Sequence, residues 1–204
     1  GLLKPIVNAF SSVCVQSAQQ AERFESVGLL PEKIHVTGNI KFDRKPDSLA
    51  ESEINQLRKS LALSENHRIF LAGSTHPGEE EIIAEAFARL KTTFQELILI
   101  LAPRDPRRAD EICEFLGGRG WSVRKMHYRI EAKADITVID VIGLLGHLYV
   151  LADIAFIGGS LIPFGGHNPL EPAAFSKPIF FGPFMGDFPE ISDMLLSNGG
   201  ARSE

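Results

Sequence analysis

The sequence has few cysteines, no long apolar run and no excess of positive charge, and each shortage excludes a class of protein. Its two cysteines, Cys14 and Cys113, stand in apolar surroundings, so we expect buried thiols in a reducing compartment rather than a disulfide framework. No apolar stretch approaches the roughly 20 residues that a membrane-spanning helix needs. The net charge of -5 leaves no basic footprint, which argues against a nucleic-acid partner.

What is present is a regular alternation of strand and helix patterns. Residues 97–102 form a continuous apolar run, which is typical of a strand covered on both faces. Residues 79–93 predict a helix whose apolar face holds Ile82, Ile83, Ala86, Phe87 and Leu90. The alternation predicts an α/β fold with a mostly parallel sheet. Further strands are expected at residues 12–15, 34–36, 68–72, 121–124, 136–139, 154–157 and 179–181, and further helices at residues 17–27, 107–116, 144–151, 169–175 and 188–197.

The start of the chain differs from the rest. The first ten residues contain one lysine and no cleavage signal, so they are not a secretory leader. They begin without Met inside an apolar segment, and we therefore expect a fragment of a longer chain. Residues 43–48, with Pro46 and four charged residues, predict a linker and a domain boundary.

The most informative stretch follows the strand expected at residues 154–157. It contains two glycine pairs, Gly158-Gly159 and Gly165-Gly166, and then Asn168 as an expected helix cap with Pro169 at the first helical position. Glycines let a ligand approach the backbone, and a helix start offers N–H groups to an anion. Glu171 could accept bonds from sugar hydroxyls. A nucleotide-sugar site and an ordinary glycine-rich turn with a capped helix fit this pattern about equally.

Three other predicted strands also end in residues suited to ligands. Gly73, Ser74 and Thr75 form a small polar loop before a helix, which predicts either an anion cradle or simple helix capping. Arg104, between two prolines, suits a phosphate, although a surface ion pair with Asp105 is the alternative. Because ligands of such sheets bind outside the carboxyl ends of the strands, these loops together favour a binding site. The third of these strands, expected at residues 136–139, is followed by the loop around Gly143.

Other chemistries have less support. His76 and His167 have no cysteine or carboxylate at ligand spacing, so we expect no metal site. Ser160 does not stand in the turn of a hydrolase nucleophile. Gly158-Gly159 does not extend into a dinucleotide-binding fingerprint, and we expect no cofactor.

The ordered motifs resemble those of 3-deoxy-D-manno-octulosonic acid (Kdo) transferases. The resemblance is carried most specifically by the run from Gly165 to Ala174, Gly-Gly-His-Asn-Pro-Leu-Glu-Pro-Ala-Ala. It spans nearly the whole chain, because four more motifs follow the family in the same order: Thr-Gly-Asn-Ile-Lys-Phe-Asp at 37–43, Ala-Gly-Ser-Thr at 72–75, Ala-Pro-Arg at 102–104 and Ile-Phe-Phe-Gly-Pro at 179–183.

The resemblance implies a GT-B glycosyltransferase with two Rossmann-like domains and the active site between them. Such an enzyme transfers Kdo from CMP-Kdo to lipid IVA, with inversion, in lipopolysaccharide inner-core synthesis. It works without a metal at the cytoplasmic face of the bacterial inner membrane. By the family pattern, the donor would contact Pro103, Arg104, Ile142, Gly143, Leu144, Asn168, Pro169, Leu170 and Glu171. Possible additional contacts are Gly73, Ser74, Thr75, Gly159 and Gly166.

The resemblance also implies that the chain is one part of the enzyme. Residues 1–43 would be the tail of the N-terminal acceptor domain, and residues 44–204 a soluble donor-binding domain truncated at its C-terminal end. The general base and the membrane anchor would lie in the missing N-terminal part, so we expect no transfer by the chain alone.

Two residues depart from the family, and two other functions stay open. The family usually has His at the position of Asp105 and an acidic residue at that of Leu144. Either Asp105 turns away, toward Arg107 or Arg108, or the donor is handled differently. One alternative function is a GT-B transferase or epimerase that uses a UDP-sugar. The other is a nucleotide-sugar binding domain without catalysis.

Overall fold

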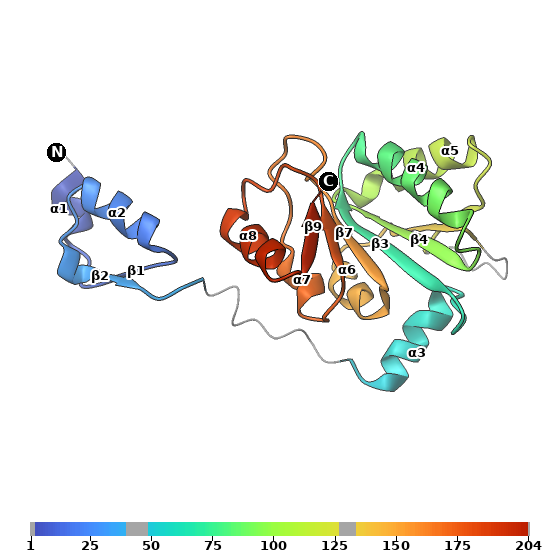
Figure 1. Ribbon diagram of the computed structural model, residues 1–204, viewed down its shortest axis with the longest axis horizontal. Coiled ribbons are helices and arrows are strands. Elements are labelled where there is room, and N and C mark those ends of the chain that lie inside the picture. Colours follow the sequence, from blue (N-terminus) through green and yellow to red (C-terminus); the bar gives the residue numbers. More distant parts are fainter. Residues whose placement is uncertain (1–2, 40–48, 127–133, 204) are drawn as a thin grey trace. The chain divides into compact units, whose positions relative to one another are not determined.

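The protein consists of two compact units, residues 1–45 and 46–204, in a computed structural model (Figure 1). The structure describes residues 3–39, 49–126 and 134–203. The predicted linker at residues 43–48 and the last four residues of the motif at 37–43 lie outside the described residues.

The smaller unit is a short αβαβ segment. It contains α1 (Leu3–Val7), β1 (Val13–Val15), α2 (Ala18–Ser26), η1 (Pro31–Lys33) and β2 (Ile34–Val36). β1 and β2 pair in parallel, and the Ser17 side chain caps α2 by accepting from the N–H of Gln20. The expectation of two buried thiols is wrong. Cys14 is exposed in the middle of the three-residue strand β1, and Cys113 of the larger unit is only partly buried.

The larger unit is built on one sheet of seven parallel strands in the order β5-β6-β4-β3-β7-β8-β9. Its strands are β3 (Arg68–Thr75), β4 (Leu97–Pro103), β5 (Val123–Lys125), β6 (Ile136–Val138), β7 (Ile154–Ile157), β8 (Ile179–Phe181) and β9 (Ala201–Ser203). Its helices are α3 (Glu51–Ser60), α4 (Glu79–Lys91), α5 (Ala109–Gly117), α6 (Leu145–Leu148), α7 (Leu170–Ala173) and α8 (Pro189–Ser197), with 3-10 turns η3 (Pro106–Arg108) and η4 (Tyr149–Leu151).

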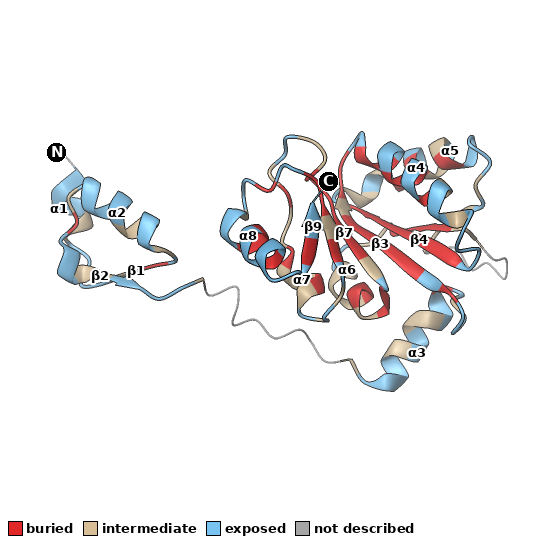
Figure 2. Ribbon diagram, in the orientation of Figure 1, coloured by how far each residue is buried: buried red, intermediate tan, exposed pale blue. Residues whose placement is uncertain are grey.

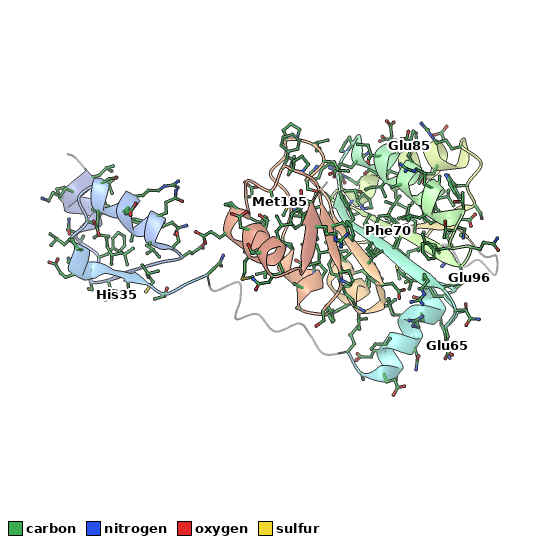
Figure 3. The ribbon with its side chains drawn as sticks, viewed as in Figure 1. His35, Glu65, Phe70, Glu85, Glu96 and Met185 are labelled. Carbon is green, nitrogen blue, oxygen red and sulfur yellow. The ribbon has the colours of Figure 1, made fainter. Side chains whose placement is uncertain are left out.

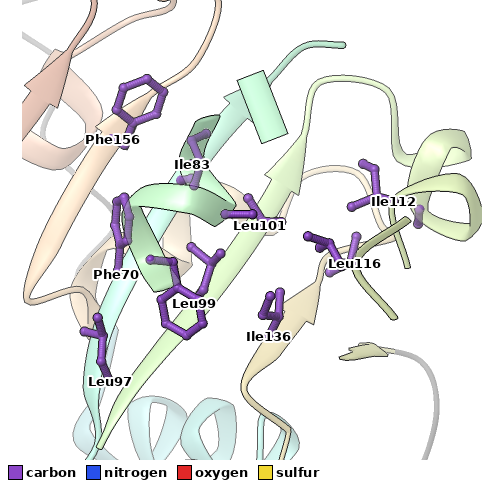
Figure 4. Packing of buried hydrophobic residues seen from close by; sticks show 14 residues of the cluster. Phe70, Ile83, Leu97, Leu99, Leu101, Ile112, Leu116, Ile136 and Phe156 are labelled. Carbon is purple, nitrogen blue, oxygen red and sulfur yellow. The ribbon is translucent and has the colours of Figure 1, made fainter. Parts of the chain in front are cut away.

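Helices cover both faces of this sheet, as the fully buried run of β4 requires (Figure 2). Successive strand residues point to opposite faces. Leu99 and Leu101 join a cluster with Phe87 of α4 and Ile112 and Leu116 of α5, which Figure 4 shows in part. On the other face, alternate residues of β3 and β4 pack against α3, α6 and η4. The predicted α/β fold with a mostly parallel sheet is confirmed, and its helices and sheet form three layers.

The predicted apolar face of α4 is partly wrong. Ile83 and Phe87 are buried as expected, but Ile82 is 47% and Leu90 36% exposed. The helix instead turns two first-turn carboxylates inward, and Glu79 and Glu80 are 0% and 3% exposed. Their burial rotates the helix away from the face that the apolar residues alone predict.

Three short features were not expected from the sequence. α1 and β9 are five and three residues long, too short for a periodic pattern to show. β3 runs three residues beyond its predicted end, to Thr75, and its pairing with β4 is interrupted at Ser74, which has a left-handed φ of 58°. This irregularity lies where the first of the predicted ligand loops begins.

Candidate functional site

The loops that follow the central strands meet at one edge of the sheet, because all seven strands are parallel. The N–H of Arg104, after β4, donates to the carbonyl of Thr75 at 2.9 Å. The N–H of Gly158, after β7, donates to the carbonyl of Gly73 at 2.8 Å. The structure therefore brings together the predicted residues that follow β3, β4 and β7.

A buried carboxylate holds two of these loops. The Glu79 side chain accepts from the N–H of His76 (2.9 Å) and of Gly159 (2.7 Å) through Oε2. Through Oε1 it accepts from the N–H of Ser160 (3.0 Å) and Leu161 (2.9 Å). Gly159–Leu161 is thus a cradle of backbone amides of the kind that binds anions, and its anion is supplied by the protein itself.

The neighbouring carboxylate, Glu80, ties the same loop to the segment after β4. Its Oε1 accepts from the hydroxyl of Thr75 and from Nη1 of Arg108, both at 2.9 Å. All three side chains are largely buried. The Thr75 hydroxyl, one of the possible donor contacts, is therefore engaged inside the protein.

Two histidines from different loops form a hydrogen-bonded pair. The Nε2 atoms of His76, after β3, and His167, after β7, are 2.8 Å apart. The ring of Phe164 lies 3.8 Å from that of His76, centroid to centroid. Burial lowers the pKa of both imidazoles, and the positive charge of Arg104 lowers both further. Both shifts favour the neutral form of the imidazoles.

Arg104 is exposed, whereas Pro103 before it is buried in the end of β4. No carboxylate of the described residues pairs with the Arg104 guanidinium. The predicted alternative of an Arg104–Asp105 ion pair is therefore not formed, and the guanidinium can receive an external anion.

Asp105 turns away from Arg104, as one of the two predicted possibilities required. Its Oδ1 accepts from Nε of Arg107 at 2.9 Å, and its Oδ2 accepts from Nη2 at 2.8 Å. This bidentate hydrogen bonding lowers the pKa of the Asp105 carboxyl to about 2. The carboxylate is charged at every physiological pH, but its charge is matched by Arg107.

The loop after β6 presents main chain rather than charged side chains. Ile142 is 90% exposed. Gly143 has a φ of 86°, which a residue with a side chain rarely adopts. Leu144 packs its side chain against the cluster beneath α3 and α6. The Leu144 carbonyl accepts from the N–H groups of His147 and Leu148 at the start of α6, and its side chain offers no charge to a ligand.

The helix after the glycine-rich loop starts later and is shorter than predicted. α7 begins at Leu170 with Pro169 as its N-cap residue and no side-chain cap, so the prediction of Asn168 as the cap and Pro169 as the first helical residue is wrong by one position. The Asn168 side chain instead accepts from the N–H of Leu170 at 3.2 Å, just before the helix. Glu171 lies in the first turn, as expected.

Gly159 and Gly166, both possible donor contacts, serve the loop itself. The N–H of Gly166 donates to the carbonyl of Gly159 at 2.8 Å. Met185, labelled in Figure 3, lies so close to Gly166 that a Cβ there would overlap its sulfur. Both glycines are buried and keep the loop folded tightly against the loop after β8.

The described residues hold neither a cluster of metal ligands nor a membrane-spanning helix. Among residues 3–39, 49–126 and 134–203, no group of three or more His, Cys, Asp or Glu side chains is placed to hold a metal ion. No helix in those ranges is long and apolar enough to cross a bilayer.

Sequence reasoning missed the two residues that organise this site. At the start of the helix expected over residues 79–93, Glu79 and Glu80 fit first-turn acids, which favour a helix start and do not require burial. The only available signal was their position, directly after a polar loop that ends a strand. Three of the four partners of Glu79 lie 80 to 82 residues away, beyond any local pattern.

The chain is similar to known proteins along nearly its whole length. Residues 1–44 match the family model described as 3-deoxy-D-manno-octulosonic-acid transferase. The 3-deoxy-D-manno-octulosonic acid transferase of Haemophilus influenzae is 34% identical over 196 residues. Those residues cover 95% of this chain and 45% of that protein, so the chain spans less than half of that relative's length.

Solved structures agree with this relationship. The C-terminal CMP-Kdo binding domain of WaaA from Acinetobacter baumannii is 32% identical, with a TM-score of 0.68 over 75% of this chain and 80% of that one. A glycosyltransferase from Rickettsia africae has a TM-score of 0.58 over 100% of this chain and 52% of its own, at 16% identity, which concerns the fold alone. The predicted class, a Rossmann-like half of a GT-B glycosyltransferase, is confirmed.

Proposed function

The chain belongs to the 3-deoxy-D-manno-octulosonic acid (Kdo) transferase family, and on that premise we propose that its larger unit binds the donor CMP-Kdo. One observation carries this proposal: the A. baumannii domain that shares the fold and 32% of the sequence is a CMP-Kdo binding domain. The convergence of the predicted donor contacts at one edge of the sheet supports it.

Each group in the proposed site has a role that follows from its chemistry. The Arg104 guanidinium is exposed and has no carboxylate partner among the described residues. It therefore suits the phosphate, which it can bind through two N–H groups. Backbone groups of Pro103 and of the loop from Ile142 to Leu144 would hold the cytidine. Asn168, Pro169 and Leu170 would approach the donor from the other side, with the Glu171 carboxylate accepting from ribose hydroxyls.

We further propose the complete reaction and the place of this chain in it. The parent enzyme transfers Kdo with inversion from CMP-Kdo to lipid IVA, in lipopolysaccharide synthesis at the cytoplasmic face of the inner membrane. Residues 1–43 belong to the N-terminal acceptor domain, and the match of residues 1–44 to the family model supports this division. The general base comes from the part of that domain outside this chain. Residues 44–204 form the donor-binding domain.

The experiment that tests donor binding is a calorimetric titration of the whole chain with CMP and, separately, with UMP. We expect CMP to bind, with a dissociation constant in the millimolar range or tighter, and UMP to bind more weakly. Absence of CMP binding at millimolar concentration contradicts the proposal. A preference for UMP favours a UDP-sugar enzyme instead.

Replacing Arg104 with alanine should weaken CMP binding at least about tenfold, because a hydrogen bond between charged groups contributes roughly 1.5–3 kcal/mol. The matched control is Arg89→Ala, which removes the same charge from an exposed position near the end of α4. Equal affinity of the two variants, measured in the same titration, would show that Arg104 does not hold the phosphate.

The chain alone should transfer no Kdo from CMP-Kdo to lipid IVA, because the proposed general base lies outside it. The check is an assay with labelled donor, in which a complete Kdo transferase serves as positive control. Product formation by the 204-residue chain would place the base within these residues.

A further inference from the structure

The two histidines that meet at the site lie where the order in which the chain adds strands to the sheet reverses. From β3 the chain continues to β4 on one side, whereas from β7 it continues to β8 on the other, and β3 and β7 are neighbours. In parallel sheets the crevice at such a reversal is where ligands bind. His76 comes from the loop after β3 and His167 from the loop after β7, so their pair spans this crevice.

The pair also lies between two of the proposed donor contacts. His76 follows Thr75, whose carbonyl accepts from the N–H of Arg104. His167 directly precedes Asn168. A phosphate bound between Arg104 and Asn168 is therefore next to the imidazoles.

Backbone amides of the crevice are already used. The N–H groups of Gly159, Ser160 and Leu161, which could otherwise cradle a phosphate, donate to the Glu79 carboxylate. Of the cationic or protonatable side chains near the crevice, Arg104 and the two imidazoles can receive an incoming anion, whereas Arg108 is already paired with Glu80.

We propose that the His76–His167 pair is part of the phosphate subsite and takes up one proton when the phosphate of a cytidine nucleotide binds. The inference rests on the donor-binding function proposed above. In the neutral pair one Nε2–H donates to the other Nε2, and the donating ring has a bare Nδ1. The added proton binds at that Nδ1, and the shared Nε2 contact remains.

The surrounding charges determine the direction of the change. Arg104 lowers the pKa of both rings, and Arg108 lowers that of His76. The Glu79 carboxylate raises the pKa of both rings, Glu80 raises the pKa of His76, and Asp187 raises the pKa of His167. Burial lowers both pKa values by more than these carboxylates raise them. A phosphate beside Arg104 offsets its positive charge and adds negative charge. The bound pKa is then higher than that of the unliganded pair, so binding tightens as pH falls through the interval between the two values.

The direct test is an NMR titration of the imidazole nitrogens in the whole chain, with no ligand, with CMP and with cytidine. We expect CMP, but not cytidine, to raise the pKa of the pair by about one unit, which corresponds to a tenfold gain in affinity across the interval. His35 in the smaller unit and His67 at the opposite end of β3 are internal controls and should not shift.

A variant gives the second measurement. The double variant His76→Gln with His167→Gln keeps hydrogen-bonding side chains but neither can titrate, so its CMP affinity should lose the additional pH dependence. The phosphate of CMP itself titrates near pH 6, and the variant and a His35→Gln control both retain that contribution. CMP binding without a shift in the imidazoles overturns this inference and leaves the proposed function intact. No CMP binding by the native chain overturns both.

Discussion

Replacing Glu79 with alanine is expected to lower the free energy of unfolding by about 4 kcal/mol or more, because four buried N–H groups lose their acceptor at about 1–3 kcal/mol each. The carboxylate is 0% exposed, so water cannot take its place without opening the loop. The measurement is urea denaturation followed by the fluorescence of Trp121. This single tryptophan packs against Phe87 of α4, with ring centroids 5.0 Å apart, and therefore reports on the larger unit.

The control for this variant stands two positions away. Glu81 is exposed on the same helix, and Glu81→Ala should change stability by no more than about 0.5 kcal/mol. Glu79→Gln is a second comparison. The NH₂ of the glutamine amide would face two of the four N–H donors, so this variant should also lose much of the stabilisation. An ordinary substitution lowers the free energy of unfolding by about 1 kcal/mol. If Glu79→Ala lowers it by no more than this, the cradle is not needed to hold the loops.

The second large effect is expected at Gly158, where β7 leaves the sheet. A Cβ on this residue would overlap the carbonyl oxygen of Ser74 and lie 2.7 Å from Cα of Thr75. Both obstacles are backbone of the neighbouring strand, so neither can rotate away. Gly158→Ala should therefore lower the free energy of unfolding by about 3 kcal/mol, at the upper end of overpacking effects.

A matched glycine distinguishes this steric effect from the general effect of adding a methyl group. Gly146 lies inside α6, and a Cβ there has nothing within 4 Å. Gly146→Ala should raise stability by about 0.5–1 kcal/mol, since alanine favours a helix more than glycine does. If both variants unfold at the same urea concentration, the close approach of β7 to β3 is not what makes Gly158 necessary.

The sequence predicted those parts of the fold that local patterns encode. The apolar run from Leu97 to Ala102 could only be a strand covered on both faces, and it became the buried core of β4. The strand at Ile154–Ile157 matched its predicted bounds, because glycines end it directly. The predicted apolar face of α4 was partly wrong, because Glu79 and Glu80 are buried while Ile82 and Leu90 are exposed.

The site was predicted as a set of loops but not as a set of contacts. Parallel strands place their carboxyl ends together, so the approach of Arg104 to Thr75 follows from the topology. The acceptor of the Gly159 amide and the partner of His76 do not follow, since they lie 80 and 91 residues away. A carboxylate inside the protein and a pair of rings depend on the packed geometry of two loops, which no spacing in the sequence reveals.

The position of β3 in the sheet has a consequence for the order in which the chain folds. Its pairing with β4 joins neighbouring segments, but its other edge pairs Phe70–Gly73 with Ile154–Ile157, more than 80 residues later. During synthesis this edge stays open until β7 emerges, and such long-range parallel pairing is slow. The loops of the proposed donor site close across the same seam. Closure of this seam and assembly of the site therefore depend on the same late pairing, and a chain that stops before Ile157 can complete neither.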